Sequence, residues 1–166
     1  MSLERSARPA GAGDEEFLFR LYVSTRAAEM AAFGWPPEQQ EIFLRMQYRA
    51  RTGGYSATYP NAGHTILLEA GAPVGAMIVN RDSKEVRLVD IAFLTEHRNH
   101  GYGQREVSNL IRQAAALALP LRLSVRRENP AVRLYQRLGF IPISEDAMYI
   151  EMEYPAGEDI GNRPSA

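Results

Sequence analysis

The sequence predicts an α/β fold with a mixed, mostly antiparallel twisted sheet flanked by helices. Before residue 60, apolar residues recur at helical spacing in two stretches. Three apolar, partly β-branched runs separated by turn residues follow between residues 64 and 94. After residue 100, two further helical patterns alternate with short strand patterns up to residue 154. This order is helix-helix, three strands, helix, strand, helix and two strands, which is typical of a mixed sheet covered by helices.

The N-terminal part is predicted to hold a tail and two helices. Residues 1–13 are rich in Ala, Gly, Arg and Pro and are expected to form a flexible tail. Asp14 can cap a first helix that ends near Met30. Pro36-Pro37 fits the first turn of a second helix, which Gly53-Gly54 is expected to end.

The remaining elements follow from shorter patterns. Strands are predicted at residues 64–69, 73–79, 85–94, 121–125, 141–143 and 148–154. Helices are predicted at residues 102–117 and 130–138, the second with Gly139 as its C-cap. We expect a single domain over residues 14–155 and a second flexible tail over residues 156–166.

Composition excludes several classes of partner. The formal net charge is −1 and no block of basic residues is present, so no nucleic acid is expected as a partner. No apolar run approaches the roughly 20 residues that span a bilayer, so no membrane partner is expected. The N-terminus has no apolar signal core, which makes a cytoplasmic location the expectation.

The most informative stretch is Arg98-Asn99-His100-Gly101-Tyr102-Gly103, between a predicted strand and a predicted helix. Backbone N–H groups at a helix start converge on one spot, and the helix dipole favours negative charge there. Gly101 and Gly103 allow close approach of a phosphate, and Arg98 adds a guanidinium suited to phosphate oxygens. The stretch therefore predicts a site for a phosphorylated cofactor.

Three phosphate motifs compete for this stretch. The P-loop needs a Gly-Lys pair, which the chain lacks. The dinucleotide fingerprint needs a third glycine, and Glu106 occupies that position. The third pattern, Arg/Gln-x-x-Gly-x-Gly/Ala, is matched completely by Arg98, Gly101 and Gly103.

This third pattern resembles the pyrophosphate-binding turn of the GCN5-related N-acetyltransferases. A second block, from Asn129 through Leu134-Tyr135 to Gly139-Phe140, is similar to another segment of that family at the expected separation. The resemblance covers residues 86–154, about half of the chain, and residues 1–60 carry no such motif. It implies the acyl-CoA N-acyltransferase fold and acetyl-CoA as cosubstrate.

The resemblance also implies which residues bind the coenzyme. The turn would hold the pyrophosphate, the strand end would pair with the pantetheine arm, and Asn129 would reach the same arm or cap the following helix. The coenzyme-binding residues expected in this way are Phe93, Leu94, Arg98, Asn99, His100, Gly101, Tyr102, Gly103 and Asn129.

Two residues are candidates for catalysis. The resemblance implies that Tyr135 lies near the coenzyme sulfur as general acid; otherwise it is a packed helix aromatic. Asp90 interrupts an apolar strand, where an unpaired carboxylate is costly, so it is the candidate base, directly or through a water. The alternative for Asp90 is a structural ion pair with Arg87 or another arginine, and Glu69 is a weaker rival base.

The absence of cysteine restricts the chemistry of any acyl transfer. With no Cys there is no disulfide, thiolate zinc site or cysteine acyl-enzyme, and three histidines make a metal site unexpected. The Gly-x-Ser-x-Gly nucleophile motif is also missing. Acetyl transfer would therefore proceed by direct attack in a ternary complex.

Some positions depart from the family pattern, and the acceptor stays open. The family usually has Pro at the position of Thr95 and Gly at that of Asn99. It usually has a small residue at the position of Gln104 and an apolar one at that of Glu106. The N-terminal aromatic residues would suit an apolar acceptor if they line the site, and Arg49 and Arg51 would equally suit an acidic one; these aromatics are Phe33, Trp35, Tyr48, Tyr55 and Tyr59.

The sequence thus predicts an N-acetyltransferase that acts on a primary amine of a small molecule or peptide. One alternative is a non-catalytic coenzyme A-binding sensor or scaffold, which would keep the turn without depending on Tyr135. Another is an acyltransferase with a different acyl chain or acceptor. The last strands could present an open edge to a second copy, so a homodimer also stays open.

Overall fold

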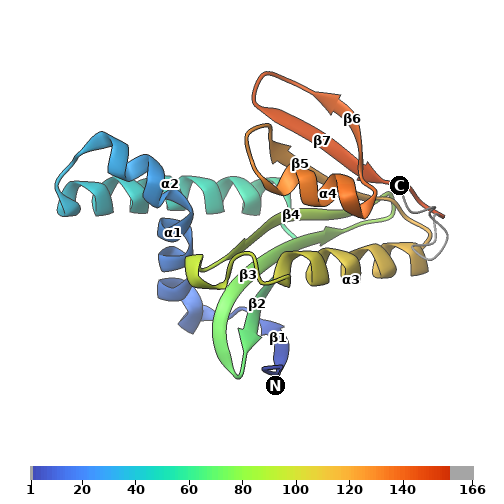
Figure 1. Cartoon of the computed structure of the whole chain (residues 1–166), viewed down its shortest axis with the longest axis horizontal. Coiled ribbons are helices and arrows are strands. Elements are labelled where there is room, and N and C mark those ends of the chain that lie inside the picture. Colours follow the sequence, from blue (N-terminus) through green and yellow to red (C-terminus); the bar gives the residue numbers. More distant parts are fainter. Residues whose placement is uncertain (1, 158–166) are drawn as a thin grey trace. The chain divides into compact units, whose positions relative to one another are not determined.

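A computed structural model describes residues 2–157 of the chain (Figure 1). Its helices are α1 (Glu15–Phe33), α2 (Pro37–Thr58), α3 (Tyr102–Ala116) and α4 (Ala131–Leu138), with short 3₁₀ turns η1 (Ala12–Asp14) and η2 (Thr95–His97). Its strands are β1 (Arg5–Pro9), β2 (Gly63–Glu69), β3 (Ala72–Arg81), β4 (Val86–Phe93), β5 (Leu121–Arg126), β6 (Ile141–Glu145) and β7 (Tyr149–Tyr154).

The seven strands form a mixed sheet in the order β1-β2-β3-β4-β5-β7-β6. β1 pairs with β2, β5 with β7 and β7 with β6, all antiparallel, whereas β4 and β5 run parallel. The parallel pair places Leu88 beside Leu123, and α3 supplies the crossover that a parallel connection requires. The predicted α/β class with a mixed, mostly antiparallel sheet is confirmed.

Where the sequence predicts one domain over residues 14–155, the chain divides into two compact units. The first unit comprises Met1–Ile78 with Asp90–His100, and the second comprises Val79–Val89 with the chain from Gly101 onward. β3 and β4 each contribute residues to both units. Residues 158–166 of the expected C-terminal tail lie outside the described residues.

The expectation of a flexible tail over residues 1–13 is wrong for residues 5–9, which form β1. Arg5 pairs with Glu69 and Pro9 with Thr65 along an antiparallel ladder with β2. No apolar alternation announces this strand, because its side chains are mostly exposed and backbone hydrogen bonds hold it in place.

Asp14 begins α1 but does not cap it with its side chain. Its carboxylate instead accepts two hydrogen bonds of 2.8 Å from the guanidinium of Arg8 and one from the N–H of Gly11. The hydrogen bonds from Arg8 and Gly11 lower the pKa of Asp14 to about 2. The carboxylate thus joins β1 to the start of the helix.

The second helix passes through Gly53-Gly54, where the sequence predicts its end, and continues to Thr58. Each interior glycine costs about 1 kcal/mol relative to alanine, so packing must offset this cost. The ring of Tyr55 lies beneath the guanidinium of Arg51, four residues earlier, at 5.1 Å. Helix α1 also runs past its predicted end near Met30, to Gly34 in the left-handed conformation.

The core of the first unit lies between α1 and α2 and is strongly aromatic. Phe19 and Tyr22 each place their ring centroid 5.6 Å from that of Tyr48. Met30 and Leu44 complete this buried cluster. The contact between the two helices therefore fixes the orientation of α2, and with it the positions of Tyr48 and, one turn later, Arg51.

In the second unit, α3 and α4 both pack on β5, and they contact each other (Figure 1). The helices bury a stripe of apolar side chains against the alternate residues of the strands. Those below 2% exposure in this unit are Val86, Val107, Leu110, Ile111, Leu121, Leu123 and Met152. Tyr135 of α4 contacts Phe140, which in turn contacts Tyr154 edge-on. Gly139 ends α4 with φ 108°, as predicted for its C-cap.

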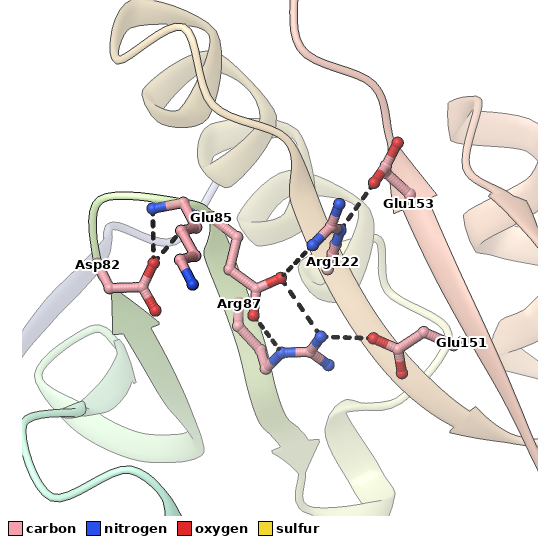
Figure 2. Close-up of polar contacts among 7 residues, drawn as sticks. Asp82, Glu85, Arg87, Arg122, Glu151 and Glu153 are labelled. Atoms are coloured by element: carbon pink, nitrogen blue, oxygen red, sulfur yellow. Dashed lines mark hydrogen bonds and ion pairs between the residues drawn. The ribbon is translucent and has the colours of Figure 1, made fainter. Parts of the chain in front are cut away.

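Strands β4, β5 and β7 carry a ladder of charged side chains (Figure 2). Arg87 donates to Glu85 at 2.8 Å and to Glu151 at 2.5 Å. Arg122 donates to Glu153 at 2.7 Å and to Glu85 at 3.2 Å. These four contacts tie three neighbouring strands together, and the partner of Arg87 is therefore not Asp90.

Among the described residues, no helix is long and apolar enough to cross a membrane.

Candidate active site

The turn between β4 and α3 has the backbone that the sequence predicts for an anion site. Gly101 is left-handed, with φ 79° and ψ 9°, and caps the 15-residue helix α3. Asn99 is also left-handed, with φ 61°. Asparagine tolerates this conformation better than most residues, which explains how it replaces the glycine usual at this position in the resembled family. The N–H of Arg105 is the first to bond back into the helix, to the carbonyl of Gly101.

The side chain of Arg98 is used within the first unit. Its Nε donates to the carbonyl of Phe93 at 3.0 Å and its Nη2 to Oγ of Ser24 at 3.2 Å. Its backbone N–H donates to the carbonyl of Thr95. Arg98 therefore fastens the end of β4 to α1, rather than presenting the phosphate-binding fork expected from the sequence.

A second arginine reaches the turn from an unexpected direction. Arg5 of β1 donates from Nη2 to the carbonyl of His100 at 3.3 Å. No sequence pattern singles out this residue, because it lies in the stretch that is expected to be a tail. Pairing of β1 with β2 is what brings this guanidinium beside the turn.

The end of β4 is held closely against β3. The N–H of Leu94 donates to the carbonyl of Val74, and its own carbonyl accepts from His97. Both backbone groups of Leu94 thus form hydrogen bonds inside the chain. Gly75 permits this approach: a Cβ there would stand 2.5 Å from the ring of Phe93 and 2.6 Å from the carbonyl of Ala92.

Asp90 forms an ion pair with an arginine that the sequence does not single out for it. Its Oδ1 accepts from Nη2 of Arg51 at 2.7 Å, and the Asp90 side chain is 24% exposed. Burial raises the pKa of the Asp90 carboxyl, and the neighbouring Arg51 lowers it in part. The pair lies in the first unit and lines a cavity there with Tyr22 and Tyr55.

Two further candidates lie in the second unit. Tyr135 is 6% exposed and packs against Phe140 at 5.6 Å between ring centroids. Asn129 accepts a hydrogen bond from the N–H of Ala131 at 2.9 Å through its Oδ1. This capping of the first turn of α4 is one of the two roles expected for Asn129.

The structure places the rival base Glu69 and the N-terminal aromatic residues in different surroundings. Glu69 lies 3.9 Å from Arg5 and 3.8 Å from His97, so a guanidinium and an imidazole already face this rival base. Of the N-terminal aromatics, Tyr48 and Tyr55 line the cavity of Asp90. Phe33 instead stacks on Trp35, away from that lining. No cluster of three metal-ligating side chains occurs among residues 2–157.

A mixed sheet of this strand order, with a left-handed glycine before α3, defines the class as an α/β protein whose helix start is suited to an anionic group. The Acetyltransferase (GNAT) family matches residues 18–140 in its sequence profile. Because this match spans most of the chain, the protein belongs to that family. The predicted family is therefore confirmed, and with it the general activity of acetyl transfer from acetyl-CoA.

Solved structures show the same fold at low sequence identity. The PaiA N-acetyltransferase from Thermoplasma acidophilum, crystallised with coenzyme A, aligns with a TM-score of 0.69 at 16% identity, covering 92% of this chain and 99% of that one. A histone acetyltransferase HPA2-related protein from Corynebacterium glutamicum aligns with a TM-score of 0.67 at 20% identity, covering 96% and 99%.

The ribosomal-protein-S18-alanine N-acetyltransferase from Escherichia coli aligns with a TM-score of 0.66 at 18% identity, covering 94% of this chain and 96% of that one. No curated protein sequence compared with the chain matches it. The structural likeness therefore establishes the fold, and the family profile establishes the class of activity.

Proposed function

We propose that this protein is an N-acetyltransferase that moves the acetyl group of acetyl-CoA to a primary amine. The amine attacks the thioester carbonyl directly, in a complex that holds both substrates. The amine nitrogen forms the new bond to the carbonyl carbon as the carbon–sulfur bond breaks. The nitrogen loses a proton and the departing sulfur gains one.

The observation that carries this proposal is the turn before α3. Gly101 is left-handed there and begins a helix of 15 residues, whose first N–H groups have no acceptor within the helix. A pyrophosphate placed at this helix start would receive those N–H groups and the positive end of the helix dipole. The guanidinium of Arg5, fixed on the carbonyl of His100, adds positive charge beside the turn.

We propose a coenzyme-binding set that is narrower than the one expected from the sequence. We retain the turn residues Asn99, His100, Gly101, Tyr102 and Gly103 as the pyrophosphate site. Their support is the local backbone geometry together with the family motif. The strand end at residue 93 stays the proposed pairing site of the pantetheine arm, and the side chain at position 129 serves mainly as a helix cap.

The reaction poses two proton problems. An amine with a pKa of about 10.4 is protonated at neutral pH, and deprotonating it costs roughly 4–5 kcal/mol. The departing coenzyme thiolate has a conjugate acid of pKa about 8.5 and benefits from a proton donor. Because the chain has no cysteine, it cannot solve either problem through a cysteine acyl-enzyme.

Asp90 and Tyr135 are the proposed proton carriers. Asp90 lines a cavity. Burial raises the pKa of its carboxyl, which brings this pKa closer to the value that suits a general base near neutral pH. Tyr135 is proposed as the acid for the sulfur because it holds the tyrosine position of the family segment. Its burial at 6% exposure keeps the ring in a fixed position on α4.

The test is release of coenzyme A thiol from acetyl-CoA in the presence of a panel of primary amines. We expect saturable, amine-dependent release, and Tyr135→Phe should lower turnover at least about tenfold while coenzyme binding persists. Tyr149→Phe, at an exposed position of β7, is the matched control and should keep full turnover. Unchanged turnover in Tyr135→Phe would remove this residue from the mechanism.

The same assay separates the proposal from a binding module. A protein that binds acetyl-CoA at micromolar concentration but releases no thiol with any amine would be a coenzyme sensor or scaffold. Release with a hydroxyl acceptor or a longer acyl chain, and not with amines and acetyl-CoA, would indicate an acyltransferase of different specificity.

A further inference from the structure

The first unit contains a cavity of about 70 Å³ beside the end of β4. Its walls come from α1, α2, β2, β3 and β4, and most of its lining is apolar or aromatic. Arg51 and Asp90 both line it. The two side chains remain 35% and 24% exposed, and the apolar lining removes part of their hydration, so this ion pair requires an explanation.

Arg51 is held in place on three sides. Its Nη2 donates to Oδ1 of Asp90 at 2.7 Å. Its guanidinium carbon lies 5.4 Å from the ring centroid of Tyr22 and 5.1 Å from that of Tyr55. Guanidinium carries five N–H donors in a planar fork, so the hydrogen bonds of Arg51 with Asp90 and with Tyr55 still leave capacity for a second carboxylate.

Stability alone is a poor explanation for this pair. A partly exposed ion pair such as this one contributes little to stability, and desolvation of its buried part opposes even that gain. Met30 of α1 and Leu44 of α2 belong to one buried cluster, so the same helices also pack through apolar side chains. A fixed cation and anion that both line one cavity point instead to a ligand with two opposite charges.

The charge of the lining favours such a ligand over a simple cation. Burial raises the pKa of Tyr48 to about 12, so this phenol is neutral at physiological pH. Apart from the imidazole of His64, the formal charges of the lining are those of Arg51 and Asp90, which sum to zero. A plain ammonium therefore meets no net attraction, whereas a dipolar ligand can place each charge against its opposite.

We propose that this cavity is the acceptor site and takes a small amino-carboxylate, with its carboxylate on Arg51 and its amine beside Asp90. The inference rests on the proposed function and names the substrate class of that activity. The structure supplies the contacts on the protein side: the paired guanidinium and carboxylate, and the two tyrosine rings beside Arg51.

The size of the cavity limits the acceptor. A buried water requires about 15 Å³ of cavity volume, so a cavity of about 70 Å³ has room for about five waters. The smallest amino acids have a similar number of non-hydrogen atoms. Apolar side chains at Ala76, Ile78 and Ala92 line the rest, so a short aliphatic substituent fits this site and a charged one does not.

The charges also balance during the reaction. When the attacking amine transfers its proton to Asp90, Arg51 loses the negative charge of its partner. A carboxylate of the acceptor, already on the guanidinium, then supplies that charge. Loss of that first proton leaves a neutral amine, which forms its bond to the acetyl carbon as the carbon–sulfur bond breaks. The nitrogen then loses its second proton to solvent, and the sulfur leaves with a proton from another donor.

The test compares each amino acid with the amine that lacks only its carboxylate: alanine with ethylamine, and β-alanine as a spacing control. Binding to the full-length protein is measured by saturation-transfer NMR titration, with and without coenzyme A. We expect alanine to bind at least about tenfold more tightly than ethylamine. Arg51→Met should abolish this difference, and Arg51→Lys, which keeps a cation for Asp90 but not the fork, should reduce it.

Arg49→Met is the matched control, because Arg49 lies on the exposed side of the same helix and outside the cavity lining. It should leave the preference for alanine unchanged. Equal binding of alanine and ethylamine to the wild-type protein overturns the inference, as does an undiminished preference in folded Arg51→Met or Arg51→Lys.

Failure of the proposed function gives a different result. If acetyl-CoA does not bind, or no amine releases thiol, the acetyltransferase proposal fails whatever the binding preference. If ethylamine is acetylated as readily as alanine and binds as tightly, the proposal of N-acetyl transfer stands and the amino-carboxylate site is rejected. The binding titration needs no turnover, so the two results are read separately.

Discussion

Replacing Gly101 by alanine tests the turn, because the structure allows its two effects to be separated. A Cβ at Gly101 meets no heavy atom of the described residues within 4 Å, so the substitution causes no internal collision. The strain comes from φ 79°, the left-handed region, which costs a residue with a side chain about 1–2 kcal/mol. Any collision must therefore come from a bound ligand.

A matched control exists in the hairpin between β2 and β3. Gly71 has the same φ of 79° and equally open space where a Cβ would stand, and it lies outside the turn before α3. Gly71→Ala should lower the free energy of unfolding by about the same 1–2 kcal/mol. For a chain of this size, that corresponds to a fall in Tm of roughly 2–8 °C.

The two variants should differ in coenzyme binding. We expect Gly101→Ala to weaken acetyl-CoA binding at least about tenfold, because its Cβ occupies space that the phosphate approaches. Gly71→Ala should bind as the wild type does. Thermal unfolding and calorimetric titration of both proteins provide the data. Wild-type affinity in Gly101→Ala, with the expected loss of stability, would refute the assignment of this turn to the pyrophosphate.

Three further substitutions test the framework around the site. Gly75→Ala should destabilise the protein by about 1–3 kcal/mol in urea denaturation and shift the NMR signals of Phe93, since its Cβ would overlap β4; unchanged spectra would contradict the close approach. Arg8 holds the pKa of Asp14 at about 2, so this carboxylate stabilises the fold fully above its unfolded pKa of about 4 and loses that effect as pH falls toward 2. Asp14→Asn should therefore lower stability at pH 7 and flatten its decline between pH 4 and 2; an unchanged acid profile would exclude this linkage. Arg87→Met should cost about 2–4 kcal/mol because it removes the cation of the partly buried Glu151 and leaves Glu85 with Arg122 alone, and a loss below 0.5 kcal/mol, about the effect of an ordinary surface change, would show that the ladder does not stabilise the sheet.

The sequence predicts most elements because their apolar patterns are strong. The helix after the turn and the short helix ending at Gly139 appear at nearly their predicted bounds. The errors fall where stability comes from contacts distant in sequence. β1 has no apolar alternation and is held by its ladder with β2, and α2 passes through Gly53-Gly54 because its packing offsets the cost of two glycines.

In the candidate site, too, the sequence predicts local features and misses contacts between distant residues. Local backbone properties follow from the sequence, so the helix after Gly101 begins where the motif predicts it. Side-chain partners do not, because they come from elements far along the chain. For Asp90 the sequence leaves Arg87 or another arginine as partner, and it is the fold that brings Arg51, 39 residues away, against it. Arg98 likewise finds Ser24 rather than facing the turn.

The central claim is that acetyl-CoA binds at the turn before α3, and backbone amide NMR of the 18.6 kDa protein tests it most directly. During titration with acetyl-CoA, the largest amide shifts should fall on residues 99–104 and saturate at micromolar ligand, with little change at the Gly71 hairpin. Shifts that cluster elsewhere, or no saturable shift at millimolar acetyl-CoA, would contradict the account.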